Sequence, residues 1–200
     1  MTPIVNVGYD STNYYVLGQG SKRLLVDVGW SNTLPKLLAN LKRKDIALDQ
    51  IRFLLATHYH PDHAGLAQEL KAKGVRLIVV DIQRPFIPVL KTWMKPVNRY
   101  VEITLHDNVM LTCAASRTFL ADLAISGEVI HTPGHSDDSV TLVLDDGAAF
   151  TGDLTSPFMV DEGSAAAVLE SWSAVRARKV RTIYPGHGPP HPMPPDPARA

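Results

Sequence analysis

The stretch His58-Tyr59-His60-Pro61-Asp62-His63 places three imidazoles and one carboxylate within six residues. It follows an apolar run, residues 51–56, that the pattern predicts to be a buried strand. The first two histidines share one phase of the strand alternation, and the proline favours the first turn of a helix. The aspartate and the third histidine would approach the same point from that turn. Nitrogen and oxygen donors gathered at such a junction suit a borderline metal such as zinc.

The composition of the 200-residue chain narrows the class of protein. Lys+Arg and Asp+Glu are both 20, and a formal net charge of zero argues against nucleic acid or an anionic membrane as the main partner. The single cysteine, Cys113, excludes an intramolecular disulfide or a CxxC metal site. The first thirty residues show no signal-peptide pattern, and no apolar run reaches membrane-spanning length. We expect a cytoplasmic protein with a small-molecule substrate; the sequence does not indicate its oligomeric state.

Short strands and amphipathic helices alternate along the chain. The predicted strands are residues 4–7, 14–17, 24–28, 51–56, 75–80, 128–132, 140–144, 148–151 and 181–184, and the predicted helical stripes are residues 34–41, 66–73 and 168–175. This order predicts helices packed on a largely buried sheet. We expect residues 1–188 to form one domain. Seven prolines from residue 185 onward predict that residues 189–200 are an irregular or disordered tail.

Three regions outside the regular pattern are open to interpretation. Residues 83–105 contain several prolines and large apolar side chains, which fits either a lid over the site or a connecting helix packed on the core. Cys113 lies in an apolar context and is expected to be a small buried residue. His106 is expected to be an ordinary surface histidine in a turn, and His191 in the proline-rich tail is expected to take no part in the site.

Three more donors follow predicted strands, each beside a glycine in a turn. They lie in Thr132-Pro133-Gly134-His135, Thr151-Gly152-Asp153 and Pro185-Gly186-His187-Gly188. Any one of them alone would be an ordinary turn residue, but glycine lets the backbone approach a ligand closely. With the first stretch, the metal-ligand candidates are His58, His60, Asp62, His63, His135, Asp153 and His187. Five imidazoles and two carboxylates suffice for two metals and an open position.

This order of motifs resembles the metallo-β-lactamase superfamily. Residues 58–63 match the family's HxHxDH motif, and the three later donors follow in the family's order, so that the resemblance covers residues 4 to 188. Leu25-Val26-Asp27-Val28-Gly29 also looks like the family's early strand. The resemblance implies an α/β (α+β) fold: a four-layer αββα sandwich, in which two mixed β-sheets are flanked by helices and metals bind at one edge.

The resemblance also implies a role for each candidate. By position, the first metal would be bound by His58, His60 and His135, the second by Asp62, His63 and His187, and Asp153 would bridge them. Asp27 would support the ligands, although its place at a strand end also fits a loop or helix cap. Asp62 would be the catalytic residue that orients a hydroxide and moves a proton. Tyr59 would contact the substrate if its ring turns inward. The cofactors implied are two zinc ions per chain, with iron or manganese as alternatives.

The function implied is a binuclear zinc-dependent hydrolase of the glyoxalase II or lactonase type. It would use a metal-bound hydroxide to cleave a small ester, thioester or lactone. Asp153 stands where the family's true β-lactamases usually carry cysteine or serine, so we do not expect antibiotic hydrolysis as the main activity. The alternatives are a non-haem iron oxidoreductase similar to sulfur dioxygenases, a phosphodiesterase, which the neutral charge disfavours, and a non-catalytic binding protein.

Overall fold

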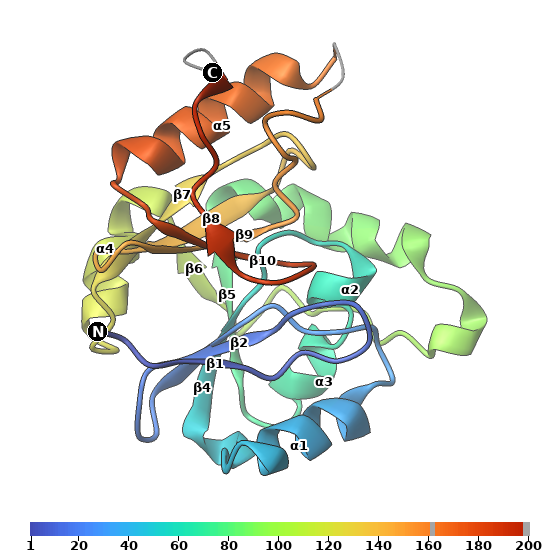
Figure 1. The fold of residues 1–200 in the computed structure, drawn as a ribbon. Helices are drawn as coiled ribbons and strands as arrows, with labels where there is room; N and C mark the ends of the chain where they lie inside the picture. Colours follow the sequence, from blue (N-terminus) through green and yellow to red (C-terminus); the bar gives the residue numbers. More distant parts are fainter. Residues whose placement is uncertain (161–162, 198–200) are drawn as a thin grey trace.

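Two β-sheets lie face to face in the computed structural model, which describes residues 1–160 and 163–197 (Figure 1). The first sheet has the order β1-β2-β3-β4-β5-β6 and the second the order β11-β10-β9-β8-β7. The strands of the first sheet are β1 (Ile4–Asn6), β2 (Tyr15–Leu17), β3 (Arg23–Val26), β4 (Ile51–Leu55), β5 (Arg76–Val80) and β6 (Val109–Leu111). Those of the second are β7 (Gly127–His131), β8 (Val140–Leu144), β9 (Ala148–Gly152), β10 (Thr182–Pro185) and β11 (His191–Pro192).

Both sheets are mixed. In the first, β1, β2 and β3 pair antiparallel, and β3 to β6 pair parallel. In the second, β9 and β10 pair parallel, and the remaining pairs are antiparallel. Parallel neighbours need crossover connections, which places helices on the outer faces. The helices are α1 (Leu34–Arg43), α2 (Pro61–Ala64), α3 (Ala67–Lys71), α4 (Cys113–Ala121) and α5 (Ala165–Ala177), with 3₁₀ segments η1 (Leu48–Gln50), η2 (Asp81–Trp93) and η3 (Pro96–Asn98).

Three apolar clusters fill the spaces between the layers. Side chains of a strand alternate between the two faces of its sheet. In β3, Leu25 therefore packs toward α1 and α3, whereas Leu24 and Val26 pack toward the second sheet. A third cluster lies between the second sheet and α5. Figure 1 shows α1 and α3 outside one sheet and α5 outside the other. The predicted αββα sandwich is thereby confirmed.

The predicted strands are all present, with bounds that differ by one or two residues. The predicted helix after Pro61 is instead two short helices, α2 and α3, because the chain is held between them. A Cβ on Gly65 would lie 2.3 Å from the carbonyl oxygen of Pro61, and Leu66 N donates to Gly29 O. Two strands, β6 and β11, and one α-helix, α4, were not predicted, nor were the short 3₁₀ segments η1 and η3.

The tail prediction was wrong for its first part. His191 and Pro192 form β11, which pairs antiparallel with β10, and Met193 N donates to Arg181 O. Residues 198–200 of the predicted tail lie outside the described residues. His191 is exposed in β11, and His106 is exposed in its turn as expected. Cys113 is only partly buried, as the first residue of α4.

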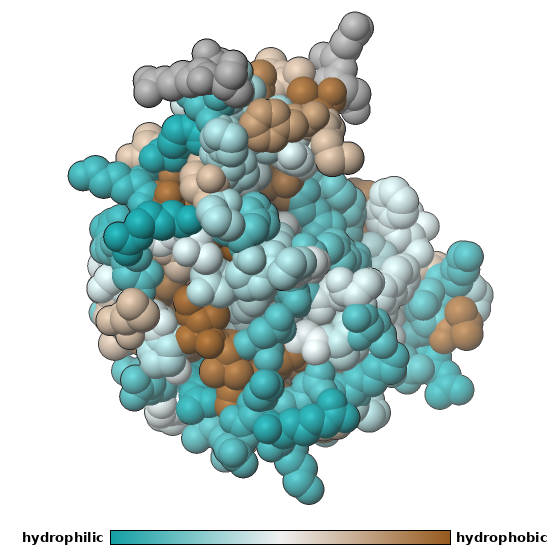
Figure 2. Space-filling view, viewed as in Figure 1, coloured by the Kyte–Doolittle hydropathy of each residue, from teal (hydrophilic) through white to brown (hydrophobic). Residues whose placement is uncertain are grey.

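Residues 83–105 contain a packed connecting segment. η2 buries Gln83, Ile87 and Leu90, and two of these join the apolar cluster under the first sheet. This arrangement fits the connecting helix rather than the lid. In the described ranges, no helix has both the length and the apolar character needed to cross a membrane. Figure 2 shows that the visible face is largely hydrophilic, with hydrophobic side chains in separate patches.

Candidate metal centre

The seven predicted donors meet at one edge of the two sheets. His58 and His60 lie in the loop after β4, and Asp62 and His63 lie in α2. The other three follow β7, β9 and β10, one donor after each strand: His135, Asp153 and His187. β7, β9 and β10 all run in the same direction, so their C-terminal ends share one edge of the second sheet. The fold therefore delivers donors from both sheets to a common point.

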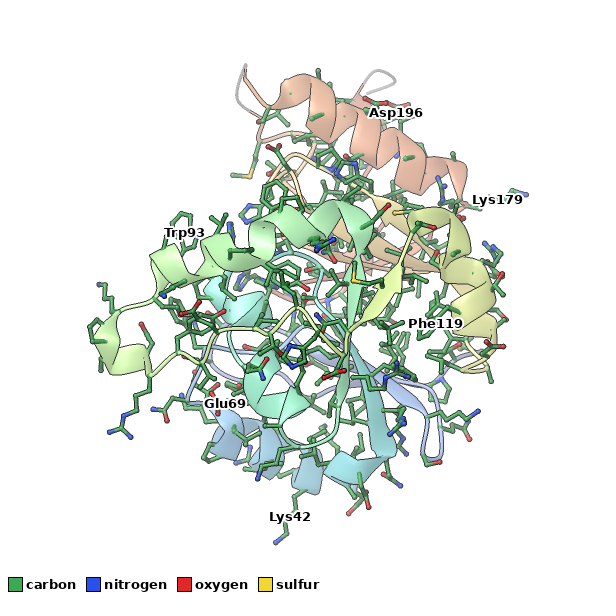
Figure 3. All side chains as sticks on the ribbon, turned by 180° about the vertical axis from the view of Figure 1, so that it is seen from behind. Lys42, Glu69, Trp93, Phe119, Lys179 and Asp196 are labelled. Atoms are coloured by element: carbon green, nitrogen blue, oxygen red, sulfur yellow. The ribbon has the colours of Figure 1, made fainter. Side chains whose placement is uncertain are left out.

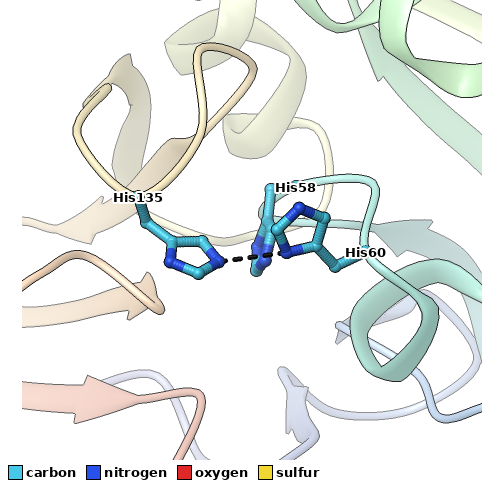
Figure 4. Close-up of side chains that lie close together, drawn as sticks. All are labelled: His58, His60 and His135. Atoms are coloured by element: carbon cyan, nitrogen blue, oxygen red, sulfur yellow. Dashed lines mark hydrogen bonds between the residues drawn. The ribbon is translucent and has the colours of Figure 1, made fainter. Parts of the chain in front are cut away.

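The first group comprises His58, His60 and His135, whose nearest ring nitrogens all lie within 4.8 Å of one another. Figure 4 shows His135 facing His58 and His60 from the opposite side, on a loop of the second sheet. His135 Nε2 lies 3.0 Å from His60 Nδ1, and the rings of His58 and His135 meet edge to face. The residues predicted to hold the first metal are thus brought together.

The second group comprises Asp62, His63 and His187. Asp62 Oδ2 lies 3.2 Å from His187 Nε2 and 3.6 Å from His63 Nε2. Asp153 lies between the groups: Oδ1 is 3.3 Å from His63 Nε2, and Oδ2 is 3.8 Å from His135 Nε2. His58, His63 and Asp153 also form a compact set of their own. This placement is the one expected of a residue that joins two sites.

Three atoms at the centre are buried without a hydrogen bond among the described residues: His58 Nε2, His63 Nε2 and Asp153 Oδ1. The last two lie close together but not in hydrogen-bonding geometry. Buried polar atoms are normally paired, and an unpaired one costs roughly 1–3 kcal/mol. Three such atoms in one group could hold a cation.

The opposite ring nitrogens of three histidines are hydrogen-bonded. His63 Nδ1 donates to Asp27 Oδ2 at 2.9 Å, and His187 Nδ1 donates to Ser11 O at 2.7 Å. Thr57 Oγ1 gives its proton to Asp27, so at 3.2 Å it accepts one from His58 Nδ1. In each of these histidines a donating Nδ1 turns Nε2 toward the centre. Metal-bound histidines are typically fixed in this way.

Burial and charge oppose each other in the metal-free centre. Burial, reinforced by the neighbouring histidines, lowers the pKa of His58 well below its usual value. Burial also lowers the pKa of His135. For His63 burial acts in the same direction, but the carboxylates of Asp27 and Asp153 outweigh it and raise the pKa to about 10. Burial would raise the pKa of Asp153, but its contacts with His63 lower it. A cation would replace the proton that His63 carries at neutral pH.

Asp27 contacts both ligand loops. Its carboxylate accepts hydrogen bonds from Thr57 N, Thr57 Oγ1 and His63 Nδ1, at 2.6–2.9 Å. The residue is buried and has a positive φ of 61°, which aspartate tolerates better than most residues. Of the two interpretations open for Asp27, support of the ligands matches these contacts.

Two further residues were not found from the sequence. Asp138 Oδ2 accepts a hydrogen bond from Tyr59 N at 2.7 Å. Gln83 Nε2 donates to the carbonyl oxygens of Ala56, Thr57 and Asp138 at 3.0–3.2 Å. Both side chains are buried, and together they hold the loop of His58 to the loop of His135. A buried glutamine among apolar residues offers little signal before the fold is known.

The loop before β2 fixes His187. Asn13 N donates to Gly186 O, and Asn13 Nδ2 donates to Pro185 O and Gly188 O. Gly186 is required by close packing, because a Cβ there would lie 2.4 Å from Asp153 Oδ1. The glycine beside this ligand is thus needed for the approach that the sequence suggested.

Tyr59 does not face the centre. Its ring packs in the apolar cluster beneath the first sheet, and its side chain is almost fully buried. Alternation explains this placement, since the neighbouring His58 and His60 take the opposite direction. Burial of its hydroxyl raises the pKa of Tyr59 above its usual value. The predicted contact between Tyr59 and substrate is therefore corrected.

Comparison with known proteins agrees with this geometry. Residues 7–187 match the family model described as the Metallo-beta-lactamase superfamily. A "Beta-lactamase-like protein 2 homolog" of Drosophila melanogaster is 30% identical over 186 residues, which are 88% of this chain and 58% of that protein. An "Atrochrysone carboxyl ACP thioesterase" of Aspergillus fumigatus is 29% identical over 188 residues, which are 88% of this chain and 37% of that protein. The chain thus spans less than two thirds of these relatives.

Among solved structures, a metallo-beta-lactamase family protein from Thermus thermophilus has the same fold. The two chains superimpose with a TM-score of 0.75 at 19% sequence identity. The match covers 96% of this chain and 75% of the other.

Proposed function

Since the chain belongs to the metallo-beta-lactamase superfamily, we propose that it is a hydrolase that binds two zinc ions and cleaves a small ester, thioester or lactone. The observation that carries the proposal is the convergence of seven donors, among which His58 Nε2, His63 Nε2 and Asp153 Oδ1 are buried without a hydrogen bond. Imidazole nitrogens and carboxylate oxygens are the donors that zinc prefers when cysteine is absent.

The residues present fit a pair of metals. His58, His60 and His135 would hold one ion, Asp62, His63 and His187 would hold the other, and Asp153 would contact both. Bound zinc lowers the pKa of a water ligand to about 7 and polarises the oxygen of a carbonyl substrate.

Asp62 is the residue of the chain best placed to move a proton. Its Oδ2 accepts a hydrogen bond from Thr12 Oγ1 at 3.2 Å and lies 3.2 Å from His187 Nε2. About a quarter of its side chain is exposed, in contrast to the fully buried His63. We assign to Asp62 the uptake of a proton from the attacking water and its transfer to the leaving group. Thr12 would keep the carboxylate aligned.

The substrate class rests on the relatives. One of them is named an "Atrochrysone carboxyl ACP thioesterase", and the chain spans 37% of that protein. This name favours an acyl thioester within the range of substrates proposed. A cytoplasmic location and a single domain over residues 1–188 stay predictions from the sequence.

The first test is metal content followed by a substrate panel. Protein purified without chelator or a histidine tag should contain about two zinc ions per chain by mass spectrometry. It should hydrolyse at least one of a set of thioesters, esters and lactones. A content of mainly iron, with oxygen uptake on thiol persulfides, would replace the proposal by an oxidoreductase. Failure to retain zinc or iron after reconstitution would refute the metal centre itself.

Replacement of Asp62 tests its assigned role. In Asp62→Asn the amide cannot take up a proton, so kcat of the zinc-saturated protein should fall by a factor of about 10²–10⁴, while the thermal midpoint of the metal-free protein changes little. Asp137→Asn is the matched control, because Asp137 is an exposed carboxylate two residues beyond His135. Activity in Asp62→Asn equal to that of the control, at equal zinc content, would exclude Asp62 as the proton carrier.

A further inference from the structure

We propose that Trp93 forms the wall of a subsite for the apolar acyl group of the substrate, either an alkyl chain or an aryl ring. This inference rests on the proposed hydrolytic function and adds to it the kind of group that the centre accepts. It concerns the part of the substrate on the acyl side of the cleaved bond.

Trp93 lies directly beside the metal centre. Its ring centroid is 5.5 Å from that of His60, with the two planes tilted by 59°. Figure 3 shows its side chain projecting from the ribbon at the end of η2. His60 belongs to the first donor group, so a substrate carbonyl bound at the centre would place its attached group within reach of the indole.

The exposure of Trp93 has no evident structural purpose. Its side chain is 57% exposed, whereas Trp172 is 3% exposed and donates from Nε1 to Thr155 O. An indole left in water forgoes a large favourable burial, and exposed aromatic residues beside a polar centre are typical of ligand sites. A bound apolar group would cover such surface.

The support of Trp93 is fixed rather than mobile. At the start of η2, Gln83 is hydrogen-bonded to the carbonyls of Ala56 and Thr57, immediately before His58. In the middle of η2, Ile87 and Leu90 are buried in the core. The backbone that carries Trp93 is therefore anchored close to the donors. A preformed wall can select a substrate without the entropy cost of ordering a loop.

The charges near Trp93 favour an apolar occupant over a cationic one. A tryptophan face binds either kind of group. The segment between Asp81 and Glu102 contains four basic residues and no acidic residue. The basic residues are Arg84, Lys91, Lys95 and Arg99, and all four are exposed. Lys91 is paired with Glu102, and the remaining excess of basic residues in this segment disfavours a cation, so that an alkyl or aryl group is the better match.

The experiment compares two thioesters of one thiol, N-acetylcysteamine, that differ only in acyl length. With zinc-loaded protein, the ratio of kcat/KM for the decanoyl and acetyl thioesters should fall about tenfold in Trp93→Ala, because apolar contact with the longer chain is lost. Trp93→Phe should keep most of the ratio. Val97→Ala should leave it unchanged, since Val97 is also exposed, at 77%, and lies only four residues further along.

Calorimetry with decanoate separates this inference from the proposed function. Decanoate should bind zinc-loaded wild-type protein more tightly than acetate does, and Trp93→Ala should remove the difference. If the wild type cleaves no thioester but shows this pattern, the hydrolase proposal fails and the subsite stands. An equal loss for both acyl lengths, or loss of zinc from Trp93→Ala, would overturn the subsite. It would also be overturned if Trp93→Ala weakened binding of a single-stranded oligonucleotide but not of decanoate.

Discussion

Asp27 illustrates how one side chain sets the charge of its neighbours. It accepts three hydrogen bonds, one of them from His63, whose pKa its carboxylate helps to raise to about 10. A histidine that binds its proton more tightly when folded stabilises the fold at low pH. This contribution is fully present below the ordinary histidine pKa of about 6.5 and is lost as the pH rises to about 10.

We therefore expect the free energy of unfolding of metal-free protein to decline between pH 6.5 and 10. In Asp27→Asn the carboxylate charge is absent, so the decline should be shallower. Urea unfolding at several pH values measures both slopes. Asp122→Asn, an exposed carboxylate on the C-terminal side of α4, is the control and should follow the wild type. Equal slopes in Asp27→Asn and the wild type would contradict the assignment.

At the level of residues, the sequence identified the metal-ligand candidates but not the side chains that hydrogen-bond to the loops carrying them. The seven donors could be predicted because each lies in a short motif whose spacing is visible along the chain. Asp138 and Gln83 were not found because they act across 79 and 27 residues of separation. The prediction for Tyr59 was wrong because its side chain lies between His58 and His60 and points the opposite way, into the apolar cluster.

The segment η2 acts on the centre through Gln83. In Gln83→Met a side chain of similar size loses the amide that pairs three backbone carbonyls. Zinc affinity at the group of His58, His60 and His135 should fall by a factor of about 10–100, the usual effect of removing a partner that orients ligands. Competition with a chromophoric chelator measures this affinity. Asp138→Asn keeps an oxygen for Tyr59 N and should change it much less.

Ser116→Ala provides the control for Gln83→Met. Ser116 is also fully buried and accepts a hydrogen bond from Val129 N, but it lies between α4 and β7. Its replacement should lower stability by about 1–3 kcal/mol and leave zinc affinity unchanged. If Ser116→Ala weakened zinc binding as much as Gln83→Met, the effect of Gln83 would reflect general destabilisation.

The short strand β11 contributes to stability although it lies in a proline-rich segment. It pairs with β10, and Met193 packs against the cluster beneath α5. A chain shortened after Pro190 should lose about 1–3 kcal/mol of unfolding free energy but retain zinc binding, because no donor is removed. A chain shortened after Pro197 is the control. Loss of zinc on shortening after Pro190 would show that His191 takes part in the centre.

At the level of elements, the strands and helices with a regular apolar pattern were predicted, and those with a weak apolar pattern were missed. Nine of the eleven strands were predicted because their apolar runs are distinct. β6 was missed although β1 and β2 are equally short. α4 was missed because only Ser116 and Leu120 are buried in it, so its sequence lacks an apolar stripe. In β11, prolines concealed a pairing that involves only two residues.

The whole molecule places the centre between its two halves. His58, His60, Asp62 and His63 belong to the first sheet and its helix, and His135, Asp153 and His187 belong to the second sheet. A metal bound there would join the sheets at one edge, and it would stabilise the fold by binding only to the native state. The large apolar cluster between the sheets also joins them and stabilises the fold, and it does not require metal.

Removal of metal should therefore lower the thermal midpoint without unfolding the protein at room temperature. Zinc at about a hundred times its dissociation constant contributes about 2.7 kcal/mol, which corresponds to roughly 5–10 °C for a chain of this size. Calorimetry before and after dialysis against chelator measures the shift. In His135→Asn, which lacks one donor from the second sheet, the shift should be smaller. An unchanged midpoint in the wild type would argue against a shared centre.

The order of the donors along the chain has a consequence for biosynthesis. Four donors are translated by residue 63, but His187 emerges from the ribosome only after 124 further residues. At about 5–20 residues per second, that interval lasts roughly 6 to 25 seconds. During this interval the nascent chain contains the four donors of the first sheet, but the donor set is incomplete because His187 has not yet been translated. If the chain binds metal as proposed, the full set of donors is available only after the final strands of the second sheet have formed.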